Sequence, residues 1–136
     1  MESQPVIVLD THVLVWWLAE PAKLSPVARR TIKAAAGNNE VAISTISVFE
    51  ISTLTRRGRL QLGIDPDQWF AALHSLPELM IEPVSAEIAW IAGTFDPVLP
   101  EDPADRIITA TASALGARLI TADEKLRAAA PVETIW

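Results

Sequence analysis

Four acidic residues of this sequence, Asp10, Glu50, Asp105 and Asp123, stand beside apolar segments where a strand or helix is expected to begin or end. Each acid alone has an ordinary explanation, such as capping a helix. Helix capping explains all four acids together less well, because clustered carboxylates repel one another and some stay protonated unless a cation compensates them. Oxygen ligands without cysteine or paired histidine select hard ions, Mg²⁺ or Mn²⁺, over zinc. The pattern therefore favours a site for a divalent cation.

The segment Val6 to Thr11 places the first acid, Asp10, at the end of a strand. Its short apolar run is typical of a central parallel strand that helices cover on both faces. Ligands bind at the carboxyl ends of such strands, where a buried Asp needs a compensating partner. Further strands are expected at 41–44, 80–84, 118–121 and 132–135, the last one at the edge of the sheet.

Helices are expected between these strands, because N-caps, first-turn prolines and glycine stops recur along the chain. Three N-caps are each followed by a proline, at Ser25, Asp65 and Asp102, while Ser85 caps a helix without one. The expected helices cover 12–19, 26–36, 47–57, 66–73, the segment after 85, and 103–115. This alternation predicts an α/β fold, a three-layer α/β/α sandwich with a mostly parallel, about five-stranded central sheet. The four acids can converge on one crevice of such a sheet.

Composition and charge narrow the classes of protein. We expect residues 1–136 to form a single domain, because half of the residues are apolar and suffice for one core. The formal charge of −6 disfavours a nonspecific nucleic-acid coat, although metal ions can reverse the local sign and permit an RNA substrate. The chain has no cysteine, which excludes disulfides and thiol nucleophiles. No segment is long enough to span a membrane, and Glu2 replaces the basic start of a signal peptide, so we expect a cytoplasmic protein.

Trp16 and Trp17 are neighbours on the first expected helix. Adjacent helical positions point about 100° apart, so one indole can enter the core while the other faces a groove or a partner. The surplus of apolar residues on the first two helices predicts an exposed patch, which usually marks an interface.

The chain resembles the PIN-domain ribonucleases, especially the VapC-like toxins of bacterial toxin–antitoxin pairs. The resemblance covers nearly the whole chain, and it rests on the order and spacing of LDTHVLVWWL, the mid-chain Glu50, DPADRIITATA and the late TAD. It implies that the catalytic, metal-binding acids are Asp10, Glu50, Asp105 and Asp123. Supporting roles beside them would fall to Thr11, Thr121 and Asp102. Position 12 is frequently Asn in the family and is His12 here, with a role that stays open.

The resemblance also implies a reaction and partners. A Mg²⁺ ion, or Mn²⁺, would activate water for hydrolysis of an RNA phosphodiester and leave products with a 5′-phosphate and a 3′-hydroxyl. We expect Arg57, Arg59 and Arg106 to contact backbone phosphates, since Arg suits bidentate phosphate binding. The expected protein partners are a second copy of the chain and a small antitoxin whose C-terminal segment lies in a groove.

Three other classes of protein have an acidic pocket of this kind, and each fits the sequence less well. A haloacid-dehalogenase-like phosphatase needs a second Asp at position 12, where this chain has His12. A response-regulator receiver domain needs paired acids after the first strand and a lysine after a late strand, and both are missing. A catalytically silent PIN module that only binds RNA or protein is disfavoured by the complete set of four acids, without being excluded.

Overall fold

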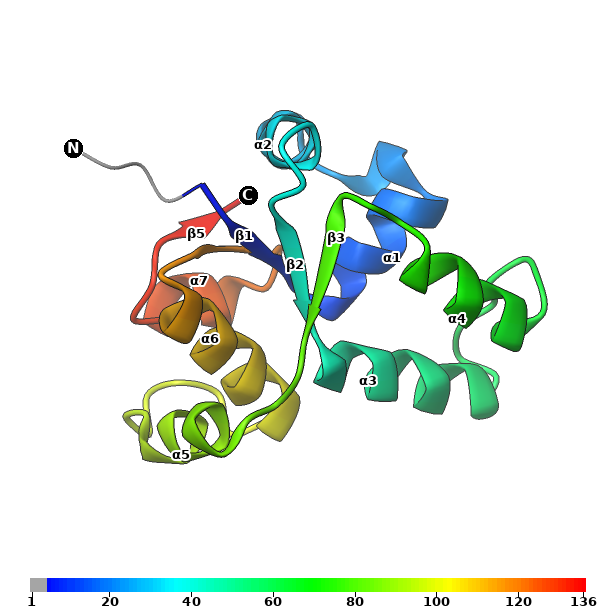
Figure 1. Ribbon diagram of the computed structural model, residues 1–136. Coiled ribbons are helices and arrows are strands. Elements are labelled where there is room, and N and C mark those ends of the chain that lie inside the picture. Colours follow the sequence, from blue (N-terminus) through cyan, green and yellow to red (C-terminus); the bar gives the residue numbers. More distant parts are fainter. Residues whose placement is uncertain (1–4) are drawn as a thin grey trace.

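The computed structural model describes residues 5–136, and Glu2 lies outside the described residues. The central sheet has five strands in the order β3-β2-β1-β4-β5, and all four strand pairs are parallel. The strands are β1 (Ile7–Leu9), β2 (Val41–Ser44), β3 (Leu79–Glu82), β4 (Arg118–Ile120) and β5 (Thr134–Ile135) (Figure 1). The predicted central place of β1 and the edge place of β5 are both confirmed. Since every strand runs the same way, their carboxyl ends lie along one edge of the sheet.

Helices cover both faces of this sheet, because apolar side chains of β1 point to both sides. Ile7 and Leu9 point into one core, while Val8 points into the other. Residues of α1 (Thr11–Ala19), α2 (Pro26–Ala36), α3 (Thr45–Arg56) and α4 (Pro66–His74) fill the first core. The second core contains α6 (Pro103–Leu115), and α5 (Ala86–Thr94) packs on α6. Two short helices, η1 (Pro21–Lys23) and α7 (Glu124–Ala129), complete the predicted three-layer sandwich.

The predicted helix starts are confirmed at four caps, where a side-chain oxygen accepts a backbone N–H of the first turn: Ser25, Asp65, Ser85 and Asp102. The prediction that Ser47 opens a helix was wrong. Strand β2 continues directly into α3, and Ser44 Oγ caps that helix by accepting the backbone N–H of Ile46 at 3.1 Å. Ser47 therefore lies inside the first turn of α3, where it is fully buried.

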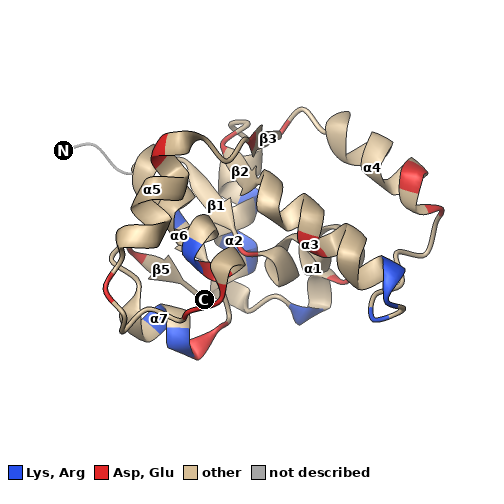
Figure 2. Ribbon diagram, turned by 90° about the horizontal axis from the view of Figure 1, so that it is seen from below, with Lys and Arg blue, Asp and Glu red and all other residues tan. Residues whose placement is uncertain are grey.

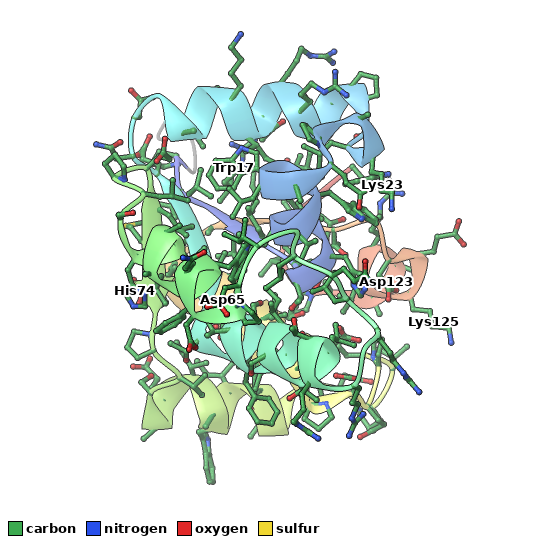
Figure 3. The ribbon with its side chains drawn as sticks, turned by 90° about the vertical axis from the view of Figure 1, so that its right-hand side faces the viewer. Trp17, Lys23, Asp65, His74, Asp123 and Lys125 are labelled. Carbon is green, nitrogen blue, oxygen red and sulfur yellow. The ribbon has the colours of Figure 1, made fainter. Side chains whose placement is uncertain are left out.

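The two neighbouring tryptophans are both partly buried and both pack on the first core, so neither is the fully buried core residue that the prediction allowed. Trp17 lies between α1 and α2 and packs on the first core (Figure 3), whereas Trp16 lines a pocket described below. The predicted apolar patch on the first two helices needs correction. The most exposed large apolar side chains there are Leu18 (36%) and Val27 (43%), while Trp90 on α5 is 76% exposed. No helix among the described residues is long and apolar enough to cross a membrane.

Candidate active site

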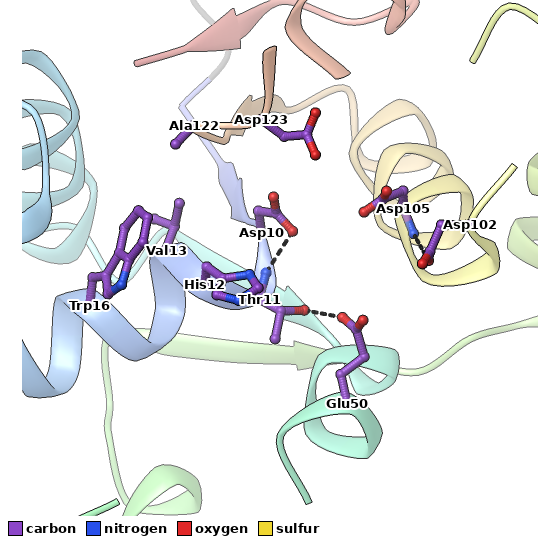
Figure 4. A pocket seen from close by; sticks show the side chains of 10 residues that line it. All are labelled: Asp10, Thr11, His12, Val13, Trp16, Glu50, Asp102, Asp105, Ala122 and Asp123. Carbon is purple, nitrogen blue, oxygen red and sulfur yellow. Dashed lines mark hydrogen bonds between the residues drawn. The ribbon is translucent and has the colours of Figure 1, made fainter. Parts of the chain in front are cut away.

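A pocket of about 440 Å³ opens at the carboxyl edge of the sheet. Asp10 follows β1, Glu50 lies on α3, Asp105 lies in the first turn of α6, and Asp123 follows β4. Figure 4 shows their carboxylates around one space. The tertiary structure thus brings together all four acids that the sequence proposed as ligands. The pocket wall also contains Thr11, His12, Val13, Trp16, Asp102 and Ala122.

Asp10 is the most rigidly held of these acids. Its Oδ1 accepts the backbone N–H of Thr11 at 2.8 Å, and its Oδ2 accepts the hydroxyl of Thr121 at 2.7 Å. Thr121 is fully buried at the end of β4, so it ties the ends of two adjacent strands together. Burial raises the pKa of Asp10, and these hydrogen bonds offset part of that rise. Asp10 is therefore preorganised, with a charge that its surroundings do not neutralise.

Glu50 is oriented by a chain of hydroxyl groups. The Thr11 hydroxyl donates to Glu50 Oε1, and Ser47 Oγ lies 2.9 Å from Thr11 Oγ1. A hydroxyl has only one proton to donate, so Ser47 must donate to Thr11 while Thr11 donates to Glu50. Burial is the main cause that raises the pKa of Glu50. Sequence reasoning missed this role of Ser47, although its helical spacing of three residues before Glu50 was a usable signal.

The carboxylate of Asp105 has no such support. The cap of α6 is made instead by Asp102. Asp102 Oδ1 accepts the backbone N–H groups of Ala104 and Asp105 at 2.8 and 3.2 Å. No hydrogen bond to the Asp105 carboxylate is found among the described residues, so Asp105 forms no capping box. Burial, followed by the negative charges of Asp10 and the other pocket acids, raises the pKa of Asp105 to about 7.

Asp123 has two roles in the structure. Its Oδ1 caps α7 by accepting the backbone N–H groups of Lys125 and Leu126 at 2.8 and 3.1 Å. Thr121 Oγ1 in turn accepts the N–H of Asp123 at 3.1 Å, which links this residue to the support of Asp10. The cap uses only one carboxylate oxygen, and Asp123 still lines the pocket.

The donor set of the pocket fits a hydrated, hard divalent ion. Within residues 5–136 no Lys or Arg lines the pocket, and the one ion pair, between Lys23 and Glu20, is not part of it. Among the described residues, no three acidic or histidine side chains lie close enough together to hold a metal ion directly as a cage. Mg²⁺ does not require such a cage, because it usually keeps several waters and binds proteins through one or two carboxylates. The unneutralised acids of the pocket could provide those ligands.

The prediction that Arg106 contacts phosphate needs correction. Arg106 is only 8% exposed, and its guanidinium donates hydrogen bonds to four backbone carbonyls, those of Ala92, Phe95, Leu99 and Pro100. It therefore holds the segment before α6, and four hydrogen bonds of its guanidinium are already used by the protein backbone. Arg57 and Arg59 are exposed but do not line the pocket. Figure 2 shows the basic segment after α3 at the outer end of that helix, away from α6 and α7.

This fold, with four acids gathered at the carboxyl edge of a parallel sheet, is that of a PIN domain. The family model of the PIN domain matches residues 7–131, and the chain belongs to the PIN-domain family. A characterised relative, the ribonuclease VapC22 of Mycobacterium tuberculosis, is 38% identical over 133 residues, which are 96% of this chain and 98% of the relative.

Solved structures contain chains with the same fold. The VapBC2 structure from Rickettsia felis, bound to a DNA fragment from its promoter, contains a chain that matches with a TM-score of 0.70 and 20% identity. The match covers 96% of this chain and 97% of that one. FitAcB from Neisseria gonorrhoeae matches with a TM-score of 0.65 and 24% identity, over 96% and 97% of the two chains. At these identities the likeness concerns the fold.

Proposed function

We propose that this protein is a metal-dependent endoribonuclease and the toxin of a toxin–antitoxin pair. One observation carries the proposal: Asp10, Glu50, Asp105 and Asp123 line one pocket of a PIN fold, and none of them has a basic partner within residues 5–136. The 38% identity to the ribonuclease VapC22 extends over nearly the full length of both chains and supports the same activity. Residues 1–136 would act as a single nuclease domain.

Each pocket residue has a role in this proposal. Asp10, Glu50, Asp105 and Asp123 would hold Mg²⁺ or Mn²⁺, which when bound supplies activation of water for attack on phosphorus and stabilisation of the leaving oxygen. Thr121 and Thr11 hold Asp10 in one orientation, and Thr11 also directs Glu50. Asp102 supports the start of α6 and leaves the carboxylate of Asp105 free for the ligand.

The proposed partners follow from the substrate and from the family. The substrate is RNA, so the protein would act in the cytoplasm. The inhibitor would be a small antitoxin, in line with the toxin–antitoxin complexes among the structures of this fold. We also propose a homodimer. Because Arg106 is buried, Arg57 and Arg59 remain the candidates for phosphate contacts outside the pocket.

The experiment is to incubate the purified protein with total cellular RNA and Mg²⁺, and then to map the ends of the fragments. We expect internal cuts that leave 5′-phosphates and that stop when EDTA removes the metal. Undiminished cleavage in excess chelator would contradict the mechanism. Binding of RNA without any cutting would identify a silent PIN module. Release of phosphate from a phosphomonoester without RNA cleavage would favour the phosphatase alternative.

A further inference from the structure

The wall of the active-site pocket has an uncharged side as well as an acidic one. The uncharged side is formed by Val13 and Trp16 of α1 and by Ala122, with the exposed ring of His12 between it and the acids (Figure 4). No Lys or Arg of residues 5–136 lines this pocket. A bound metal can hold a phosphate, and the uncharged side of the wall is then available to contact the rest of a nucleotide inside the pocket.

Trp16 is the largest of these groups, and it is held in place from two directions. Its ring centroid lies 6.1 Å from that of His12 and 5.7 Å from that of Trp136, with interplanar angles of 49° and 51°. The indole also packs on the first core and is only partly buried. Such a ring loses little conformational freedom when a ligand binds, because folding has already ordered it.

The neighbouring tryptophan provides an internal comparison. Trp17 packs on the same core and has a similar degree of burial, but it does not line the pocket. Packing on the first core therefore does not by itself place an indole at the pocket wall. Trp16 lies six residues after Asp10, or about 9 Å along the helix axis, so a ligand that spans both must be extended along α1.

We propose that Trp16 is a stacking platform for the nucleobase of the nucleotide whose phosphate would be bound through a metal ion at the carboxylates, with His12 beside the connecting sugar. This inference rests on the proposed function and adds a base-binding subsite to it. An aromatic ring can stack only on a base with a free face, so the ligand is an unpaired nucleotide of RNA. Stacking also tolerates different bases, because each base has a π-face.

The test compares two small phosphates that differ only in the base. Adenosine 5′-monophosphate resembles the product end that carries a 5′-phosphate, and ribose 5-phosphate lacks the base. Both are titrated into the intact protein with Mg²⁺ in a calorimeter. We expect the nucleotide to bind about tenfold more tightly or better, as base stacking on an aromatic side chain predicts.

Variants of Trp16 test whether the indole causes the tighter binding of the nucleotide relative to ribose 5-phosphate. Trp16→Ala should lower the affinity for the nucleotide to that for ribose 5-phosphate, while the affinity for ribose 5-phosphate stays unchanged. Trp16→Phe should retain much of the preference, because a smaller aromatic ring still stacks. Trp16→Leu tests the same point with the apolar packing kept, in case the Ala variant does not fold. The matched control is Trp90→Ala, which removes an indole that is 76% exposed on α5 and should change neither affinity.

Two results would overturn the inference: equal affinities of the wild type for both phosphates, or an undiminished preference in a folded Leu or Ala variant. If RNA is still cleaved in those cases, the proposed nuclease function stands and only the subsite is wrong. If neither phosphate binds with Mg²⁺ and total RNA is not cleaved, the proposed function itself fails, and the subsite with it.

Discussion

Among the pocket acids, Asp105 differs from Asp10 and Glu50 because its carboxylate accepts no hydrogen bond within the described residues. The first prediction is that Asp105→Asn lowers RNA cleavage by about 100-fold or more, since residues that only support a metal ligand already account for 10- to 100-fold. Asp10→Asn should behave alike. The fold should persist, because Asn has nearly the same shape. Cleavage of total RNA and thermal melting are measured together.

The control for this prediction is Glu124→Gln, which removes an exposed charge from the first turn of α7 next to Asp123. This variant should cleave RNA like the wild type. Full activity of the Asp105 variant would mean that the pocket is not the active site.

The second prediction concerns the pH dependence of stability without metal. The pKa of Asp105 is about 7 in the folded protein and 3.8 in its ordinary state, so the folded protein binds this proton more tightly. Its contribution to stability is full below the ordinary pKa and is lost as the pH rises through about 7. Burial raises the pKa of Asp10 and Glu50 in the same direction. In EDTA, the melting temperature should therefore rise when the pH falls from about 8 to about 5.5.

The Asp105→Asn variant measures how much of the pH dependence of the melting temperature comes from Asp105. The variant should melt at a higher temperature than the wild type at the upper pH, because it removes a repelled charge. It should also gain less on acidification. Identical pH profiles of wild type and variant would contradict the cause assigned to Asp105.

At the scale of elements, the buried guanidinium of Arg106 joins the end of α5, the segment 95–100 and α6. The third prediction is that Arg106→Met reduces the free energy of unfolding by about 3 kcal/mol or more, because several buried carbonyls lose their donor. Arg106→Lys should also destabilise, since an ammonium cannot reproduce the fork of donors. Denaturant unfolding measures both, with Arg57→Met as the exposed control. Unchanged stability of the Met variant would contradict this structural role of Arg106.

At the scale of the whole molecule, the four acids should couple metal binding to folding. The fourth prediction is that Mg²⁺ raises the melting temperature, because it binds the folded pocket and not the unfolded chain. At a concentration about 100 times the dissociation constant the gain is about 2.7 kcal/mol, on the order of 10 °C for a chain of this size. Asp10→Asn should reduce the shift. An equal shift in a variant that lacks two of the acids would show that the ion binds elsewhere.

The fifth prediction concerns partners. We expect a dimer in light scattering of the isolated protein, and a complex with the product of the neighbouring gene that no longer cleaves RNA. Exposed apolar side chains lie on several elements, with Phe49 on α3 64% exposed and Phe70 on α4 46% exposed, so uncovered apolar surface is present. A monomer that neither binds nor is inhibited by that product would refute the toxin–antitoxin assignment.

Local sequence determined most of the elements of this protein, because their signals are short-range. The caps at Ser25, Asp65, Ser85 and Asp102 depend on bonds between residues two or three positions apart. The apolar run of β1 likewise identified a strand covered on both faces. Such patterns also predicted a layered α/β fold with the acids at one edge, since parallel strands place their carboxyl ends together.

Only the tertiary structure decided what the polar side chains between these elements do. Arg106 looks like a surface cation in sequence, but it is buried because carbonyls from another helix and a loop converge on it. Ser47 supports Glu50 only through Thr11, a residue 36 positions away. The pKa of Asp105 depends on the burial and on charges from three other segments of the chain. These properties arise from contacts between residues far apart in the chain, and a local pattern such as the spacing of Ser47 and Glu50 does not identify the distant partner.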